Sequence, residues 1–154
     1  MLRVISPPGC LVNRVARSPR SSDTSSMERV IWVAGWEMQC CGEPFSVGSR
    51  VTWQVGRRDL DWLVENVLGP DATTVTDWYE GHPADEAGLV DATGTVGKID
   101  AVFCRYAPRP GGNPKFRSPV PGSATIEART KANGWEPENE EARFAGYVVT
   151  VTEP

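Results

Sequence analysis

The chain has 154 residues, of which 40% are hydrophobic and 23% charged, and this composition indicates one ordinary globular domain rather than a disordered or fibrous protein. Residues 1–26 carry four arginines against one aspartate, so the formal net charge of −4 leaves −7 for residues 27–154. Because nucleic-acid affinity depends on Lys and Arg side chains that neutralise phosphates, this acidic body makes a nucleic-acid partner unlikely.

Residues 1–26 are predicted to be a disordered extension, since three prolines interrupt them and Ser and Arg dominate their second half. Pro7 and Pro8 cut short the apolar run that a signal peptide requires, although the Arg- and Ser-rich composition also fits a transit peptide. Met27 is followed directly by a strand-like segment, which favours a misassigned start as the origin of the extension. We expect a single β-rich domain over residues 27–154.

Alternation of apolar and polar residues predicts about five strands. Within the second, Val51, Trp53 and Val55 fall on one face. The third is apolar on both faces, which predicts a central strand. At Gly97 the alternation of apolar and polar residues shifts by one position, which indicates a β-bulge. The fourth places small residues on an inner face and charged residues on an outer one. The predicted strands are residues 29–34, 50–55, 93–106, 124–132 and 144–152, with a further short strand over 73–78.

One short α-helix is predicted over residues 60–68. Asp59 is a favourable N-cap, Gly69 a favourable left-handed C-terminal residue, and Pro70 prevents continuation. The apolar positions follow the helical period and form one stripe. Because a helix of about ten residues is unstable alone, this stripe is expected to cover the sheet.

Three segments lack a regular pattern and are predicted to be connections: residues 35–48, 71–91 and 108–122. Asn133 and Gly134 form a strong hairpin signal before the last strand, and the acidic run that follows is expected to lengthen this connection. The whole pattern predicts a mainly β fold, a small, partly open β-barrel of SH3-like or OB-like type with one short α-helix. A two-layer α+β sheet is the alternative.

The segment Trp-Glu-Met-Gln-Cys-Cys-Gly-Glu-Pro-Phe over residues 36–45 is followed by a Val-Gly turn and the strand that contains Trp53. This arrangement resembles the Trp-x-Met-Gln-Cys-Cys-Gly-x-Pro-Phe motif of an uncharacterised family of short actinobacterial proteins that carry a domain of unknown function. Residues 94–108 resemble the second recognisable block of that family. The resemblance covers most of residues 30–152 and implies no activity, because the family has none assigned.

Four side chains of the folded part are soft metal ligands: Cys40, Cys41, Cys104 and His82. Four ligands suit structural zinc, but the adjacent cysteines lack the usual ligand spacing. They are not expected to bridge to each other easily, and both would reach one ion only through a tight turn at Gly42. The alternatives are core packing of one of the adjacent cysteines beside Cys104, with the other in the turn, and a cysteine nucleophile with His82 as base. The low cysteine count predicts a reducing, cytoplasmic location.

A candidate binding surface comprises Trp36, Trp78, Tyr79, Arg105 and Arg109. Trp and Tyr combine a large apolar area with one polar group, which suits the wall of a binding site. The basic stretch that begins at Arg105 and continues to residue 117 is suited to hold an anion or a nucleic-acid strand, or is a solvated loop.

No motif indicates catalysis, and no pair of carboxylates is placed for acid–base chemistry. The sequence therefore favours a non-enzymatic binding or interaction module with a protein or small-molecule partner, no catalytic residues and no cofactor. A small zinc- or thiol-dependent protein is the second hypothesis and a nucleic-acid-binding barrel the third. The chain contains no apolar run of about 18 residues, so no transmembrane helix and no membrane partner are predicted.

Overall fold

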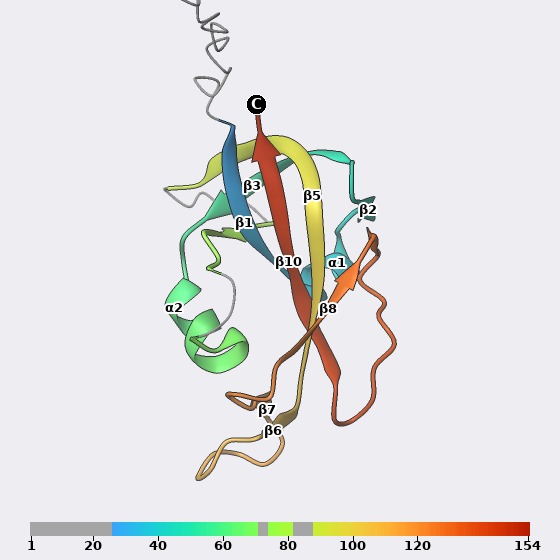
Figure 1. The fold of residues 1–154 in the computed structure, drawn as a ribbon. Coiled ribbons are helices and arrows are strands. Elements are labelled where there is room, and N and C mark those ends of the chain that lie inside the picture. The colour runs from blue at the N-terminus through green and yellow to red at the C-terminus, as the bar shows by residue number, and fades with distance from the viewer. Residues whose placement is uncertain (1–25, 71–73, 82–87) are drawn as a thin grey trace, which may run out of the picture.

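Five strands close into a small β-barrel in the computed structural model, which describes residues 26–70, 74–81 and 88–154 (Figure 1). The order around the barrel is β10-β1-β4-β3-β5, and β5 pairs back onto β10. β1 and β4 pair in parallel, and the other neighbours are antiparallel. The prediction of a small, mainly β barrel is confirmed, and the barrel is closed rather than partly open. Its strands are β1 (Met27–Ala34), β3 (Arg50–Gly56), β4 (Asp77–Tyr79), β5 (Val90–Cys104) and β10 (Arg143–Glu153).

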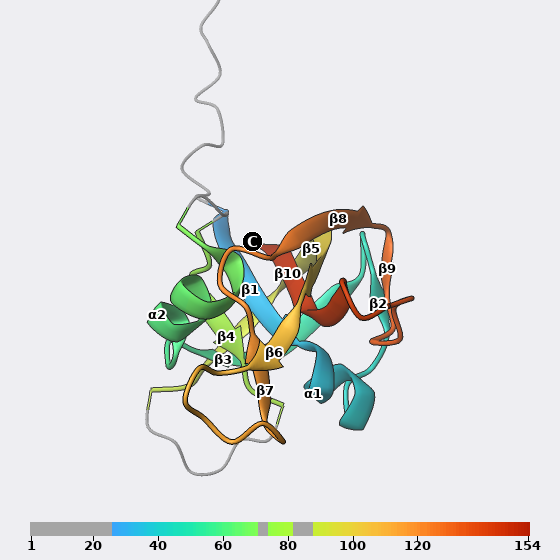
Figure 2. The same ribbon diagram turned by 90° about the horizontal axis from the view of Figure 1, so that it is seen from below.

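Shorter elements surround this barrel, and Figure 2 shows α2 on one side of it and α1, β2 and β9 on another. β8 pairs with the second half of β5, β2 pairs with β9, and β6 pairs with β7. The strands are β2 (Phe45–Ser46), β6 (Tyr106–Pro108), β7 (Arg117–Pro119), β8 (Thr125–Arg129) and β9 (Lys131–Ala132). The helices are α1 (Gly35–Cys40) and α2 (Leu60–Leu63), which continues as the π-helical turn η2 (Val64–Leu68).

β1, the second half of β5 and the middle of β10 are buried on both faces, and each face belongs to a different core. Ile31 of β1 lies in the inner core, whereas its neighbour Trp32 lies in the outer core beneath α2. β5 divides in the same way, with Phe103 in the inner core and Cys104 in the outer one. Successive side chains of a strand point to opposite faces, so two apolar faces require two cores. The central position predicted for this strand is confirmed.

The bulge predicted at Gly97 is confirmed. Thr150 of β10 lies opposite Lys98, and the next residue, Val151, lies opposite Val96, so Gly97 has no counterpart on β10. A bulge increases the local twist of a strand. β5 accordingly pairs with β3 along its first half and with β8 along its second half, while β10 occupies its other edge.

The predicted helix is present, and its stripe covers the outer core through Leu63, Val67 and Leu68. Gly69 has a φ of +79°, which favours glycine, but its ψ of 166° lies outside the left-handed helical region, so the predicted left-handed C-terminal residue does not form. Asp59 occupies the N-cap position as predicted, but it does not act as a side-chain cap. Asp59 itself adopts the left-handed conformation, with φ at +61°, and its side chain caps no backbone N–H group. Only its carbonyl oxygen contributes, by accepting the N–H of Leu63 at 3.0 Å.

Several predicted connections contain regular structure. Residues 35–48 form α1 and β2, and residues 108–122 contribute to the β6–β7 hairpin. The hairpin prediction for Asn133 and Gly134 is wrong, because β9 pairs with β2 whereas β10 pairs with β1 and β5. The inner face predicted for residues 124–132 is largely wrong as well. β8 lies outside the closed barrel, so Ile126 remains 46% exposed.

Candidate functional site

The Cys-Cys-Gly turn lies directly after α1 and is held by that helix. The N–H groups of Cys41 and Gly42 both donate to the carbonyl oxygen of Glu37, at 2.9 Å each. A Cβ atom on Gly42 would lie 2.7 Å from the sulfur of Met38 and 2.8 Å from its Cα. Glycine therefore lets the chain turn back closely against the helix, and the positions of both cysteines follow from this turn.

Glu37 connects α1 to the segment that follows β4. Its side chain is buried, and its Oε1 accepts the N–H of Gly81 at 3.2 Å. This bond joins two parts of the chain that lie 44 residues apart. It places the end of α1 beside Tyr79, so the Cys-Cys-Gly turn and β4 border the same opening.

A cavity of about 410 Å³ lies at this opening, between β1, α1, the turn, β3 and β4. One wall is a series of aromatic rings. Phe45 and Trp53 meet edge to face with their ring centroids 4.9 Å apart, and the centroids of Trp53 and Tyr79 lie 5.4 Å apart. Arg50 and Glu43 provide charged groups in the lining. The cavity therefore combines an aromatic wall with a lining that is otherwise largely polar.

Negative charge surrounds the aromatic wall. Burial raises the pKa of Tyr79, and the charges of Glu37, Cys41, Glu43 and Glu80 raise it further. Acidic groups lower the electrostatic potential at the phenol and so oppose its ionisation. The same potential favours a positively charged ligand over a negatively charged one.

The two adjacent cysteines converge at the rim. Their Sγ atoms lie 2.6 Å apart, both residues are exposed, and Cys41 lines the cavity. The hydrogen bond with Cys40, followed by desolvation and the charges of Cys40 and Glu37, raises the pKa of Cys41. A tight turn at Gly42 thus brings both thiols to one point.

Cys104 lies in the other core. It is fully buried among the outer-core residues with Trp32 and Leu63, and burial raises its pKa. Packing accounts for the environment of Cys104. The predicted packing of one adjacent cysteine beside it is wrong, because Cys40 and Cys41 are both exposed. His82 lies outside the described residues, and within the described part no three His, Cys, Asp or Glu side chains are grouped so as to hold a metal ion. A zinc site formed by the four predicted ligands stays a prediction.

The predicted binding surface is divided in the structure. Trp78 and Tyr79 are neighbours on β4, but Trp78 packs against the outer core and Tyr79 lines the cavity. Trp36 is 59% exposed on α1 and is not part of the cavity lining. Sequence reasoning missed Phe45 and Trp53 as site residues. The inward-facing pattern of residues 50–55 marked Trp53 as a core residue, and no local signal showed that its ring reaches an opening.

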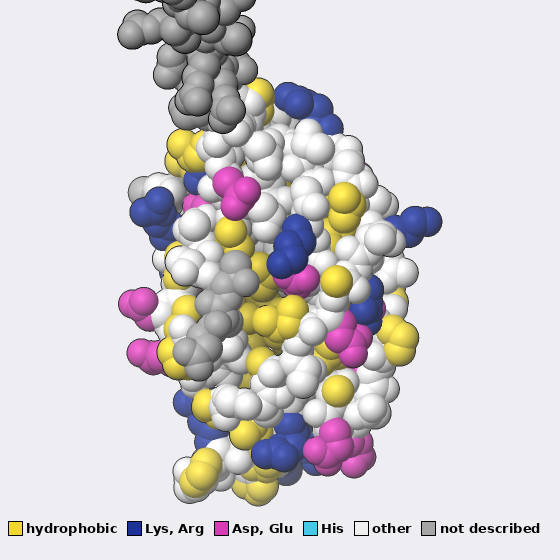
Figure 3. Space-filling model, viewed as in Figure 1, with side chains coloured by type: hydrophobic (Ala, Val, Ile, Leu, Met, Phe, Trp, Pro, Cys, Tyr) yellow, Lys and Arg dark blue, Asp and Glu magenta, His cyan; other side chains and the backbone are white. Residues whose placement is uncertain are grey.

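Arg105 and Arg109 do lie together. They line a groove of about 490 Å³ beside the β6–β7 hairpin, whose other lining residues include prolines of the same hairpin and Asn66. Arg105 also lies 3.9 Å from Glu141, measured between Nη1 and Oε2. On the face of the molecule seen in Figure 3, basic and acidic side chains are interspersed, and neither sign forms a continuous stripe.

No curated protein and no solved structure matches the chain, so the SH3-like or OB-like assignment of the barrel stays a prediction. None of the helices in the described ranges has the length and apolar character needed to cross a membrane. A family model does match residues 27–153, which include all strands of the barrel and the whole cavity lining. The chain therefore belongs to DUF6578, a family of unknown function.

Proposed function

We propose that this protein is a non-enzymatic binding module whose cavity holds a small organic cation with an apolar or aromatic part. The observation that carries the proposal is the aromatic wall of Phe45, Trp53 and Tyr79 beside acidic side chains. The faces of aromatic rings attract cations, and the attraction grows where water is partly excluded. The small-molecule partner that the sequence predicts, without identifying it, is therefore proposed to be an organic cation.

The size and charge of the cavity support this class of ligand. Its volume of about 410 Å³ lies within the usual range for small-molecule sites. Glu43 lines it, and Glu37 and Glu80 act on Tyr79 from nearby. Arg50 is the basic residue of the lining and offsets part of this charge. Arg58 lies 3.7 Å from Glu80, measured between Nη2 and Oε2, and offsets part of the charge of Glu80. Glu37 and Glu43 are therefore the acidic groups that mainly oppose an anionic ligand.

The test is a titration of the full chain with benzyltrimethylammonium, with benzoate as the anionic comparison. We expect calorimetric binding of the cation and chemical-shift changes at the indole N–H of Trp53. Trp53→Leu should weaken binding by between roughly 2-fold and 30-fold, since a cation–π contact contributes about 0.5–2 kcal/mol. Trp135→Leu is the matched control, because Trp135 is 69% exposed and lies outside the cavity lining.

Glu43→Gln provides a second variant that removes charge without removing packing, because Glu43 is exposed. It should weaken binding of the cation, whereas Glu140→Gln, a change at another exposed acidic position, should not. Equal binding of benzoate and the cation, or equal effects of the two glutamate variants, would refute the proposed ligand class. A cytoplasmic location is part of this proposal and accords with the low cysteine count of the chain.

A further inference from the structure

We propose that Cys40 and Cys41 are a redox modification site, at which the two adjacent thiols form a reversible disulfide with each other by exchange with a low-molecular-weight disulfide. This proposal does not depend on the ligand of the cavity. It concerns a pair of side chains for which the sequence alone predicts no bond, since adjacent side chains on an extended backbone point to opposite faces.

The local backbone removes that obstacle. Cys40 is the last residue of α1, and Cys41 follows it with a φ of −144° and a ψ of −5°, so the backbone at the pair is not extended. Glu37 accepts both N–H groups of the turn, and Gly42 lies against Met38. The two Sγ atoms consequently point toward each other, 2.6 Å apart.

Access and proximity also favour exchange at this pair. Both cysteines are exposed, whereas Cys104 is fully buried and inaccessible to a dissolved disulfide in the folded protein. A hydrogen bond joins the two thiols and raises the pKa of Cys41, so exchange through Cys41 becomes faster as the pH rises. A thiolate formed at one cysteine therefore accepts a hydrogen bond from the thiol of the other. When a mixed disulfide forms at one cysteine, the sulfur of the other lies next to it.

The reaction proceeds in two balanced steps. A thiolate of the pair attacks one sulfur of the dissolved disulfide, which forms a mixed disulfide and releases one small thiolate. The neighbouring cysteine, after loss of its proton, then attacks the protein sulfur of that mixed disulfide and releases the second small thiolate. In total the protein loses two protons and two electrons, which equal two hydrogen atoms, and the dissolved disulfide gains them and becomes two thiols.

The resulting bond should be easy to reduce. Consecutive Cα atoms across a trans peptide lie about 3.8 Å apart, below the roughly 4.4–6.8 Å found across ordinary disulfides. Exposed and geometrically constrained disulfides are the labile ones, so the modification is reversible under reducing conditions. Because Cys41 lines the cavity, the bond would form at the cavity rim.

The test uses the full chain with Cys10→Ser, which removes the thiol that lies outside the described residues. The protein is equilibrated with oxidised glutathione, quenched by acid and analysed by intact mass and tryptic mapping. We expect the peptide of residues 30–50 to lose two hydrogens without a glutathione adduct, and the peptide of residues 99–105 to remain a free thiol. Dithiothreitol should restore the original mass.

Cys41→Ser and Cys40→Ser in the same background are the matched controls. Each retains one exposed thiol, so each should accumulate a stable glutathione adduct on the peptide of residues 30–50. The proposal is overturned if the protein with both cysteines also accumulates this adduct, if it forms disulfide-linked dimers instead, or if its two thiols remain unmodified while the single-cysteine variants react.

Discussion

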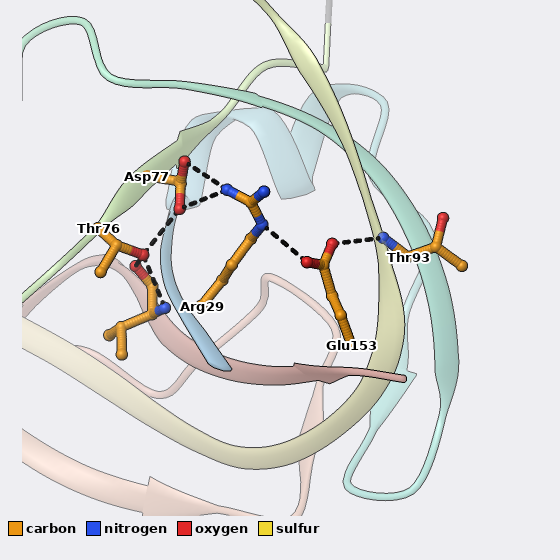
Figure 4. A network of polar contacts seen from close by, with 6 residues as sticks. Arg29, Thr76, Asp77, Thr93 and Glu153 are labelled. Carbon is orange, nitrogen blue, oxygen red and sulfur yellow. Dashed lines mark hydrogen bonds and ion pairs between the residues drawn. The ribbon is translucent and has the colours of Figure 1, made fainter. Parts of the chain in front are cut away.

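At the scale of single residues, an ion-pair network joins three strands of the barrel near both ends of the described chain (Figure 4). Arg29 of β1 donates from Nη1 to both carboxylate oxygens of Asp77, at 3.1 and 3.3 Å, and from Nε to Glu153 at 3.2 Å. Glu153 also accepts the N–H of Thr93. Burial lowers the pKa of Arg29, but the charge of Asp77 and the bonds with Glu153 outweigh this effect and raise it. The guanidinium therefore stays charged.

Asp77→Ala should lower the free energy of unfolding by about 3 kcal/mol, because it leaves the half-buried Arg29 without its main counter-charge. Urea unfolding followed by circular dichroism measures the change. Arg143→Ala is the control, since Arg143 and Glu138 are both well exposed and 3.8 Å apart. Such a surface pair contributes less than about 1 kcal/mol. Similar losses for the two variants would show that the Arg29 network does not stabilise the barrel.

At the scale of elements, β5 passes close to the end of β10, and two of its glycines differ sharply in their surroundings. A Cβ atom on Gly94 would clash with the carbonyl oxygen of Thr152 and lie 2.7 Å from its carbonyl carbon, which the backbone cannot accommodate without moving. A Cβ atom on Gly97, in the bulge, would meet nothing nearer than 3.8 Å. Close approach of the two strands, rather than bending of β5, is therefore the feature that requires glycine.

Gly94→Ala should destabilise the protein by more than about 2 kcal/mol, because the new methyl group forces β5 and β10 apart where their pairing closes the barrel. Gly97→Ala should change the free energy of unfolding by less than about 1 kcal/mol. Alanine restricts the unfolded chain more than glycine does, and this effect acts in the stabilising direction. Thermal unfolding of both variants measures the difference. Equal stabilities of the two variants would contradict the close packing of β5 against β10 at Gly94.

At the scale of the whole molecule, all three tyrosines of the chain have raised pKa values. Burial is the largest cause for each. Tyr147 is also held by a hydrogen bond that it donates to Glu136 at 2.7 Å, and it accepts the N–H of Gly134. The folded barrel therefore keeps its phenols protonated at a pH at which the unfolded chain, with tyrosine pKa values near about 10, releases those protons.

Stability should therefore fall as the pH rises above about 10, because the unfolded state then binds fewer protons than the folded state. Tyr147→Phe removes one of the titrating groups. It should lower stability near pH 8 by about 1–3 kcal/mol through the lost hydrogen bond with Glu136. Above pH 10 the free energy of unfolding of the variant should also fall less steeply than that of the unsubstituted protein, by about 1.4 kcal/mol per pH unit. Urea unfolding across this pH range tests both effects, and an unchanged alkaline slope in the variant would contradict the assignment.

The sequence by itself determined the elements that local periodicity specifies. The alternation of Val51, Trp53 and Val55 established one strand and its buried face, the spacing of Leu63 and Val67 established the helix stripe, and the phase break at Gly97 established the bulge. Each of these patterns needs only residues a few positions apart, and burial of one face is enough to produce it.

Only the tertiary structure decided how the barrel closes and what its opening contains. Asn133 and Gly134 have the chemistry of a hairpin, but strand pairing with distant segments overrides that local preference. The cavity depends on Phe45, Trp53 and Tyr79, which belong to three different strands, and on the bond between Glu37 and Gly81. Contacts of this kind arise from the closure of the whole sheet, so no local period in the sequence encodes them.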